Sequence, residues 1–236
     1  MQINPEAQKQ VKDEIIALIS RDNEKLAMRK KLCEVTAELV RNLFDDDGNN
    51  LWPDFLHFLF QLANSPVVSL KENSLIIFAL VPGIFGSQQA NYLDVIKQML
   101  TYALQSDQYS VRFYGAKALS LFILNDRESE EAVWKHFTDL VPLFLKTLEE
   151  SVHLQEDDDL LKQAIELISE NPKFMRPHLA PCLQLCLEIA KEIVFPEDWR
   201  HLALECAVTA AESIPGGVKK VCGPIVPLYI DLVSKF

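Results

Sequence analysis

Glycine is scarce in this sequence, with 7 residues among 236, and no segment keeps up an alternation of apolar and polar residues. Strands and hairpins therefore have little to build on, because tight hairpin turns need glycine and half-buried strands need that alternation. Long apolar runs are also missing. The longest, residues 75–85, contains Pro82 and Gly83, whereas a membrane-spanning helix needs about 20 apolar residues. We expect no membrane insertion, and the charges within residues 1–14 indicate no secretory signal peptide.

Positive charge and cysteine are limited too. The chain has 23 Lys and Arg against 34 Asp and Glu, a formal net charge of -11 and a sequence pI near 4.9. Such a balance argues against binding to nucleic acid or to anionic membranes, and it favours basic partners. Five cysteines, an odd number, require no disulfide framework and suggest a reducing compartment. The hydrophobic fraction of 49% supports a folded core.

Apolar residues recur at helical spacing along the chain. After Glu24 they form one stripe, which Cys33, Val40 and Phe44 widen: Met28, Leu32, Val35, Leu39 and Leu43. The cluster at residues 45–50 predicts the end of that helix, and Pro53 the start of the next. Ser69 and Glu72 have the spacing of a capping box.

A pair of helices repeats along the chain. A basic residue follows an apolar one early in every second helix, at positions 29, 71, 112, 162 and 200, which are separated by 42, 41, 50 and 38 residues. The helices between them tend to begin with proline. Periods near 40 with two helices each are typical of HEAT repeats. The predicted fold is all-α, a right-handed α-solenoid of HEAT repeats with about 11 helices. It forms a single segment over residues 1–236, with an orphan helix at 5–20 and repeats at 24–64, 69–105, 110–150, 157–192 and 196–235.

A solenoid offers extended surfaces rather than a closed pocket, so we expect function through protein binding. The sequence contains no phosphate-binding glycine loop, no H-E-x-x-H and no nucleophile elbow. The pattern therefore predicts no enzyme and no cofactor.

Several long stretches resemble one protein family. They are MRKKLCEVTAELVRNLFDDDGNNLWPDFLHFLF at 28–60, PGIFGSQQANYLDVIKQML at 82–100, KHFTDLVP at 135–142, PKFMRPHL at 172–179 and RHLALECAVTAAES at 200–213. Together they resemble the importin beta (karyopherin beta) superfamily, of the importin five, karyopherin beta three or Ran-binding protein five type. The likeness runs along essentially the whole chain and matches about repeats two to seven of such a receptor.

The resemblance implies a segment of a nuclear import receptor that shuttles between cytoplasm and nucleus through the nuclear pore. Its implied partners are Ran-GTP, Phe-Gly nucleoporins and cargo with a basic nuclear-localisation signal. An alternative of another class is a structural HEAT scaffold, similar to a phosphatase regulatory subunit, with no role in transport.

The resemblance also suggests contact residues. Phe-Gly repeats would dock between the first helices of neighbouring repeats, where Phe113 and Trp199 could project outward; either ring could instead pack against the adjacent repeat. Ran contacts would come from second helices of early repeats, which carry Asp54, Asp94 and Lys97. Ordinary helix chemistry also explains these charges, since Asp54 complements a helix dipole and Asp94 and Lys97 are spaced for an intrahelical pair.

Two further kinds of residue cluster are candidate metal sites. The acidic runs 45–47 and 157–159 fall at helix boundaries and lack EF-hand spacing, so we interpret them as solvated helix caps. His178, Cys182 and Cys186 share one helix face, with Cys206 on the following helix. Zinc is conceivable there, but the positions coincide with an apolar stripe, where cysteine acts as a small hydrophobe. The sequence therefore predicts no metal site.

Repeat arrays need polar caps at their ends. The helix at 5–20 lacks a partner within its own repeat, and Ile225, Leu228, Leu232 and Phe236 lie on a last helix with no repeat after it. We expect self-association, or amide exchange in the first helix that is faster than between Ser110 and Lys191.

Overall fold

The regular structure of this chain is helical, as predicted. The computed structural model describes residues 4–45, 50–125, 131–155 and 157–219, together with positions 223, 226, 227 and 230. Across these residues the elements are helices, and one isolated β-bridge joins Phe44 to Asn50. The all-α prediction is confirmed. Of the helices in these ranges, none combines the length and the apolar character needed to cross a membrane.

The chain divides into two compact units, residues 1–118 and 119–236, and one helix, α6, runs from the first into the second. The helices follow one another as α1 (Pro5–Ile19), α2 (Leu26–Arg41), α3 (Pro53–Ala63), α4 (Val68–Leu80), α5 (Gln89–Leu104), α6 (Tyr109–Asn125), α7 (Glu131–Phe137), α8 (Val141–Leu154), α9 (Asp159–Glu170), α10 (Pro172–Met175), α11 (Leu179–Lys191), α12 (Glu197–Ser213) and α13 (Pro215–Val218). Short 3-10 turns precede α5, α8 and α11.

The long helices begin and end near the predicted positions. α1 occupies the place of the orphan helix, and the predicted repeats contain α2 with α3, α4 with α5, α6 with α8, and α9 with α11. α12 opens the fifth repeat, whose predicted second helix, with Ile225, Leu228, Leu232 and Phe236, lies mostly outside the described residues. That residues 1–236 form a single solenoid segment stays a prediction.

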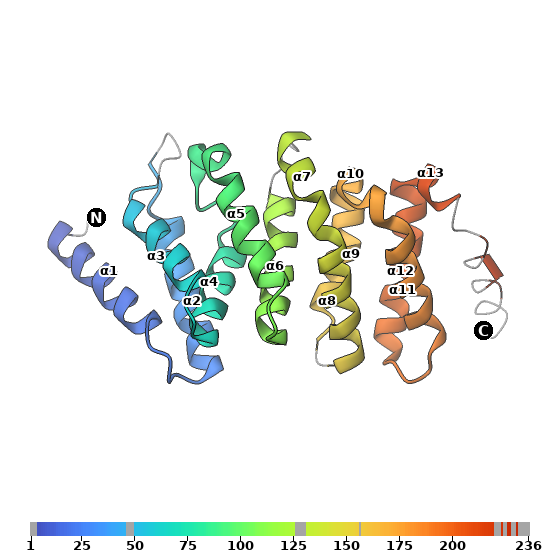
Figure 1. The fold of residues 1–236 in the computed structure, drawn as a ribbon, viewed down its shortest axis with the longest axis horizontal. Helices are drawn as coiled ribbons and strands as arrows, with labels where there is room; N and C mark the ends of the chain where they lie inside the picture. Colours follow the sequence, from blue (N-terminus) through green and yellow to red (C-terminus); the bar gives the residue numbers. More distant parts are fainter. Residues whose placement is uncertain are drawn as a thin grey trace. The chain divides into compact units, whose positions relative to one another are not determined.

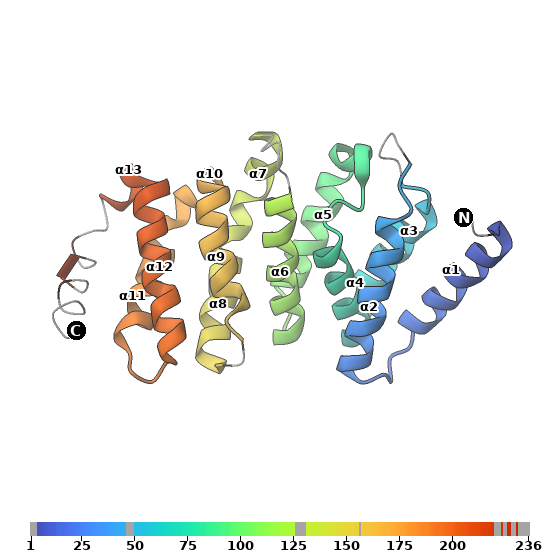
Figure 2. The same cartoon turned by 180° about the vertical axis from the view of Figure 1, so that it is seen from behind.

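Unit 1 is built in two layers. α3 and α5 face the viewer in Figure 1, and α2 and α4 face the viewer in the reverse view of Figure 2.

Local sequence sets where helices of unit 1 start. Asn4 caps α1 by accepting a hydrogen bond from the Glu6 amide at 3.0 Å. Pro53 occupies the first turn of α3, where a missing N–H costs nothing.

The buried face of α2 differs from the predicted stripe. Met28 and Val35 are 53% and 57% exposed, and the buried residues are Arg29, Cys33, Thr36, Ala37 and Val40. The predicted stripe was right for Cys33 and Val40 and wrong for Met28 and Val35, because it followed the largest apolar side chains. The packed face also includes Thr36, Ala37 and the charged Arg29.

The predicted capping box at Ser69 is also wrong. α4 starts at Val68 after Val67, which makes no side-chain cap. Glu72 instead turns inward and forms an ion pair with Arg29 of α2, with 2.6 Å between Nη2 and Oε2. Arg29 also donates to the Ser69 carbonyl at 2.8 Å and to the Asn73 side chain at 2.9 Å. Glu72 is therefore a buried ion-pair partner of Arg29 and not a helix cap. The local spacing of Ser69 and Glu72 could not reveal this, because Arg29 lies on another helix.

Unit 2 has the same two-layer build. α8 and α11 form one layer, and α9 and α12 the other (Figures 1 and 2). The Ser120 hydroxyl donates to the Gln163 side chain and so joins the last part of α6 to α9. α8 ends at Leu154, and the next residue, Gln155, has a left-handed backbone (φ 54°). The side-chain amide of Gln155 donates to the Val194 carbonyl at 3.3 Å.

Candidate protein-binding surfaces

The residues expected to contact Ran lie on neighbouring helices of unit 1. Asp54 and Asp94 are exposed on α3 and α5, and Lys97 is half-buried on α5. Asp54 is the second residue of α3, where its carboxylate complements the positive end of the helix dipole. The structure thus places both carboxylates on helices of one layer, as the sequence predicted, although it does not test whether they bind a partner.

An aromatic cluster holds α3 and α5 side by side. The rings of Phe60 on α3 and Tyr92 on α5 stack with centroids 6.4 Å apart, and Phe85, between α4 and α5, lies 4.9 Å from Tyr92 and 5.9 Å from Phe60. Phe85 is only 2% exposed. Stacked aromatic pairs of this kind stabilise a packing arrangement beyond the burial of their area. These ring contacts therefore join the two helices that carry Asp54 and Asp94.

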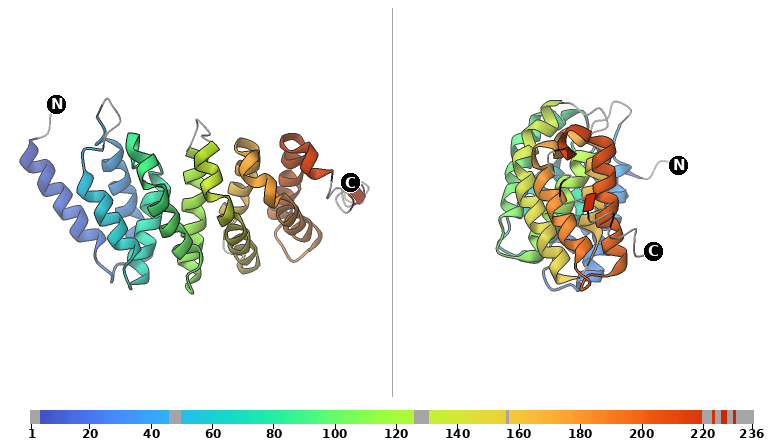
Figure 3. Two further views of the ribbon diagram at one scale, coloured as in Figure 1. Left: turned by 45° about the horizontal axis from the view of Figure 1, so that its top comes forward. Right: turned by 90° about the vertical axis from the view of Figure 1, so that its right-hand side faces the viewer.

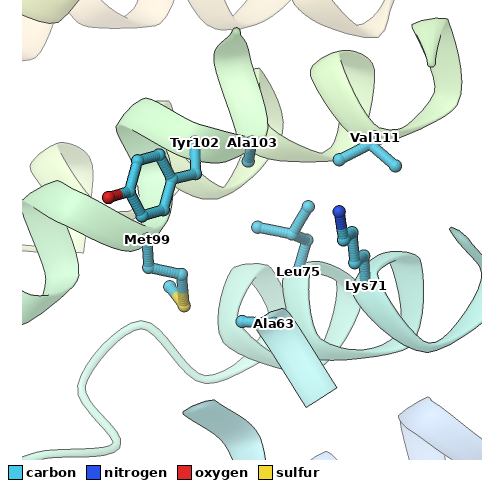
Figure 4. Close-up of a pocket in the computed structure, with 7 residues that line it drawn as sticks. All are labelled: Ala63, Lys71, Leu75, Met99, Tyr102, Ala103 and Val111. Carbon is cyan, nitrogen blue, oxygen red and sulfur yellow. The ribbon is translucent and has the colours of Figure 1, made fainter. Parts of the chain in front are cut away.

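A small hollow lies between α4, α5 and the start of α6. Figure 4 shows its lining side chains: Ala63, Lys71, Leu75, Met99, Tyr102, Ala103 and Val111. Its volume is about 20 Å³, room for about one water molecule. An organic ligand does not fit this hollow, so its surroundings favour packing rather than small-molecule binding.

Phe113 is half-buried on α6 within a second aromatic group. Its ring lies 6.0 Å from Tyr109 and 5.5 Å from Tyr114, edge to face with the latter. The Lys117 ammonium lies 5.6 Å from its centroid. The part of the ring that reaches the surface is therefore held in place by its neighbours.

Trp199 does not project outward; it packs inward, the alternative that the sequence left open. Only 8% of the residue is exposed, because position 199 lies on the inner face of α12 with Ala203, Cys206, Ala207 and Ala210. A partner can reach little of this ring. Sequence spacing placed Trp199 beside the repeat-defining Arg200 but could not tell which of the two points inward.

The acidic run 157–159 lies at the start of α9, as interpreted, but the N-cap residue Asp158 makes no side-chain cap hydrogen bond. The Asp157 carboxylate accepts the Asp159 amide at 2.6 Å at the start of α9, and Asp158 pairs with Lys162 at 2.8 Å. The hydrogen bond that Lys162 donates to the Asp158 carboxylate raises the pKa of Lys162. In the other run only Asp45 is described; Asp46 and Asp47 lie outside the described residues.

Three cysteines meet in the interior of unit 2. The Sγ atoms of Cys182 and Cys186 on α11 and Cys206 on α12 all lie within 4.8 Å of one another. Each residue is at most 1% exposed. His178 is half-buried and does not join this group. Sequence reasoning found these positions from their spacing but did not predict that Cys206 would reach the other two.

The pKa values of the three thiols move in different directions. Hydrogen bonds from Cys186 and Cys206 hold the pKa of Cys182 well below its usual value. Hydrogen bonding to Cys182, together with burial, raises the pKa of Cys186 and of Cys206. A thiolate at Cys182 would thus accept hydrogen bonds from the thiols of Cys186 and Cys206.

Three described histidines have structural neighbours rather than a nucleophile. His57 bonds to Gln61 at 2.8 Å, His153 stacks on Phe195 at 5.9 Å, and His201 lies 3.9 Å from Glu197. His57 and His201 thus contact residues of their own helices, and His153 contacts Phe195 between α11 and α12. They suggest no catalytic arrangement.

Comparison with known proteins identifies the relatives of this fold. A family profile described as "IPO5-like, TPR repeats" matches residues 24–185. TPR and HEAT repeats are both stacked pairs of helices, and the spacing of 38 to 50 residues seen here is closer to the 40–47 of HEAT than to the 34 of TPR.

Individual relatives agree with that match. The chain is 25% identical to importin-4 of Mus musculus over 72% of its length and 16% of the relative's, and 21% identical to the probable importin-5 homolog of Dictyostelium discoideum over 98% of its length and 22% of the relative's. It therefore spans less than a quarter of either protein.

Solved karyopherin structures share the fold. Kap121p bound to Nup53p and Kap121p bound to Pho4p each superpose with a TM-score of 0.73 and 22% identity, over 93% of this chain and 20% and 21% of theirs. The likeness, which extends over 93% of this chain, agrees with the predicted HEAT-repeat fold. With its profile match over residues 24–185, the chain belongs to the IPO5-like family of the importin beta superfamily.

Proposed function

We propose that this chain is a segment of a nuclear import receptor, which works by reversible binding of proteins and moves between cytoplasm and nucleus. The match to the IPO5-like family over residues 24–185 carries the proposal. The names of the relatives support it, since they are importins, and Kap121p has been solved in complexes with Nup53p and Pho4p. The surfaces described above favour binding rather than catalysis.

Basic cargo fits the charge of this segment. Acidic side chains outnumber basic ones by 34 to 23, and Asp54 and Asp94 are exposed on adjacent helices that the aromatic cluster holds rigidly. Opposite charge on a cargo would speed association and fix its register. Asp54, Asp94 and Lys97 are also the residues that we propose for a Ran-type contact.

Phe113 is the proposed contact for a Phe-Gly nucleoporin repeat. Its ring is half-buried and is fixed by Tyr109, Tyr114 and Lys117. A rigid, partly exposed aromatic ring can accept a second phenylalanine by stacking at little entropic cost. Trp199 offers too little exposed surface to share this role equally.

Capture on an immobilised Phe-Gly repeat peptide tests the proposal. We expect the wild-type chain to be retained and Phe113→Ser to be retained several-fold less, with unchanged helicity by circular dichroism. Val95→Ser, which alters another exposed apolar side chain (42% exposed, on α5), is the matched control and should behave as wild type. Trp199→Ser is unsuitable, because truncating a buried aromatic costs about 3–5 kcal/mol of stability.

Two results would count against this proposal. Equal retention of the wild type and Phe113→Ser would remove Phe113 from the contact. Failure of the wild type to bind at all would favour the structural scaffold, which needs no nucleoporin contact.

A further inference from the structure

The three-cysteine cluster of unit 2 has no role in the function proposed above. Cys182 and Cys186 are one turn apart on α11, so their side chains share a face. Cys206 comes from α12, which packs directly against α11. Figure 3 shows these two helices side by side, in orange and orange-red, near the C-terminal end. The cluster therefore bridges the second helix of one repeat and the first helix of the next.

We propose that Cys182, Cys186 and Cys206 form a binding site for a soft, three-coordinate metal ion, with monovalent copper as the fitting ion. Sulfur donors favour soft ions such as Cu(I) over Mg²⁺ or Ca²⁺, which prefer oxygen. The proposal rests on the number, the spacing and the burial of these three sulfur atoms, and it is independent of the proposed transport function.

The spacing suits planar three-coordination. With a metal–sulfur bond of about 2.3 Å, a trigonal site separates its sulfur atoms by about 4.0 Å. The three Sγ atoms already lie within 4.8 Å of one another. Side-chain adjustments of less than about 1 Å therefore complete the site, and the backbone of α11 and α12 can stay in place.

The number of donors selects against other thiophilic groups. A structural zinc ion takes four protein ligands, and iron–sulfur clusters usually take four cysteines. Among the described residues, no further His, Cys, Asp or Glu joins the group. Water is a poor fourth ligand here, because each cysteine is at most 1% exposed.

Copper binding requires proton release but no redox step. Each thiol that becomes a ligand releases its proton to solvent, and no change of oxidation state is needed. With three thiolate ligands, the bound Cu(I) leaves the site with a net charge of -2.

Copper titration of the full 236-residue chain tests the site. Reduced protein is titrated anaerobically with Cu(I) buffered by a chromophoric copper chelator. We expect one ion bound per chain and an X-ray absorption spectrum with three sulfur neighbours at about 2.3 Å. Bound copper should also raise the melting temperature of the chain, since a ligand that binds only the folded state stabilises it.

Single substitutions identify the ligands. Cys182→Ala, Cys186→Ala and Cys206→Ala should each weaken Cu(I) binding at least tenfold while circular dichroism stays that of the wild type. Cys33→Ala is the matched control, because Cys33 is also fully buried but lies in unit 1, outside the group. Cys222→Ala is a second control, and both should keep wild-type affinity.

If a ligand variant fails to fold, the spectrum and melting shift of the wild type still decide the matter. Two or four sulfur neighbours, an affinity that does not depend on Cys206, or a requirement for Cys222 would each overturn the three-cysteine site. Tighter binding of Zn²⁺ than of Cu(I) in competition would overturn the choice of ion.

Discussion

Arg29 and Glu72 form an ion pair whose contribution to the stability of the fold depends on its burial. Their charged atoms are 2.6 Å apart, and their side chains are 9% and 8% exposed. Lys31 and Glu34 also lie 2.6 Å apart, but their side chains are 75% and 49% exposed. The two pairs share a distance and differ in burial, which makes them a natural comparison.

Glu72→Ala should lower the free energy of unfolding by about 3–5 kcal/mol, because it leaves the Arg29 charge buried without its partner. Glu34→Ala should change it by about 0–1 kcal/mol, as is usual for exposed pairs. Urea denaturation of the two variants measures both values. Replacing the pair together, with Arg29→Met and Glu72→Leu, should restore most of the loss; a small effect of Glu72→Ala alone would contradict this account.

Cys33 should make stability sensitive to alkaline pH. Burial raises the pKa of its thiol from 9.0 to about 12; nearby Arg29 opposes this shift and Glu34 adds to it. Between pH 9 and about 12 the unfolded chain releases this proton while the folded chain keeps it. The stabilisation is therefore complete below pH 9 and is lost as the pH rises, by up to about 1.4 kcal/mol per pH unit.

Comparison with Cys33→Ala isolates this effect, since other titrating groups cancel in the difference. Chemical denaturation at pH 8 and at pH 10.5 should show that the advantage of wild type over Cys33→Ala shrinks at the higher pH. A difference that stays constant across this range would mean that Cys33 titrates normally.

At the scale of helices, α5 and α6 approach closely through Gly115. A Cβ atom added there would lie 2.9 Å from the Cβ of Ala103 and 3.5 Å from the Leu104 amide nitrogen. Gly115→Ala should therefore destabilise the chain by about 1–3 kcal/mol through overpacking. Gly216→Ala, where nothing lies within 4 Å, should be neutral or slightly stabilising. Thermal melting of both variants separates the packing effect from the change of residue type.

Helix α1 has little of its surface buried. Ile19 is its one buried hydrophobic residue within the described part, and Val11 is 45% exposed. Helices with few buried contacts open locally at low free energy. Hydrogen exchange followed by mass spectrometry should show faster exchange in residues 5–19 than in α9, whose face buries Leu160, Leu161, Ala164, Leu167 and Ile168. Equal protection of the two helices would refute this expectation.

Sequence periodicity predicted helices such as α3, α8 and α9 because they are amphipathic, and proline marks several helix starts, as at Pro53 and Pro5. It failed where packing overrides size. On α2 the inner face is filled by Cys33, Ala37 and Val40, while Met28 and Val35 face outward. No pattern in one helix reveals how close its neighbour comes.

The same limit applies to the candidate sites. The resemblance suggested Asp54, Asp94 and Lys97 as contact residues on second helices; the structure shows Asp54 and Asp94 exposed there, and their role stays a prediction. For Trp199 the sequence left both an outward and an inward orientation open, and the residue is buried. The meeting of Cys182, Cys186 and Cys206 depends on two helices packing in one register, and that information is absent from either helix alone.

At the scale of the whole molecule, the coverage of relatives bears on Ran binding. The chain spans 16% and 22% of the curated importins that it matches. Asp54, Asp94 and Lys97 offer a small charged surface, which affects association rate more than affinity. We therefore expect calorimetry to show weak or undetectable binding of Ran-GTP and none that distinguishes it from Ran-GDP. Nanomolar, GTP-dependent binding would contradict this prediction.

The contacts of Arg29 also bear on how such proteins could be recombined. Its guanidinium reaches Ser69, Glu72 and Asn73 of α4, and the Asn73 amide in turn donates to the Ile19 carbonyl at the end of α1 at 3.1 Å. A chimera cut between α3 and α4 would separate these partners, even though it keeps each helix pair intact. Grafts that carry α1, α2 and α4 from one parent should fold better than grafts made at repeat boundaries. The contacts among α1, α2 and α4, which cross the boundary between repeats, are thus the part to transfer intact in such a chimera.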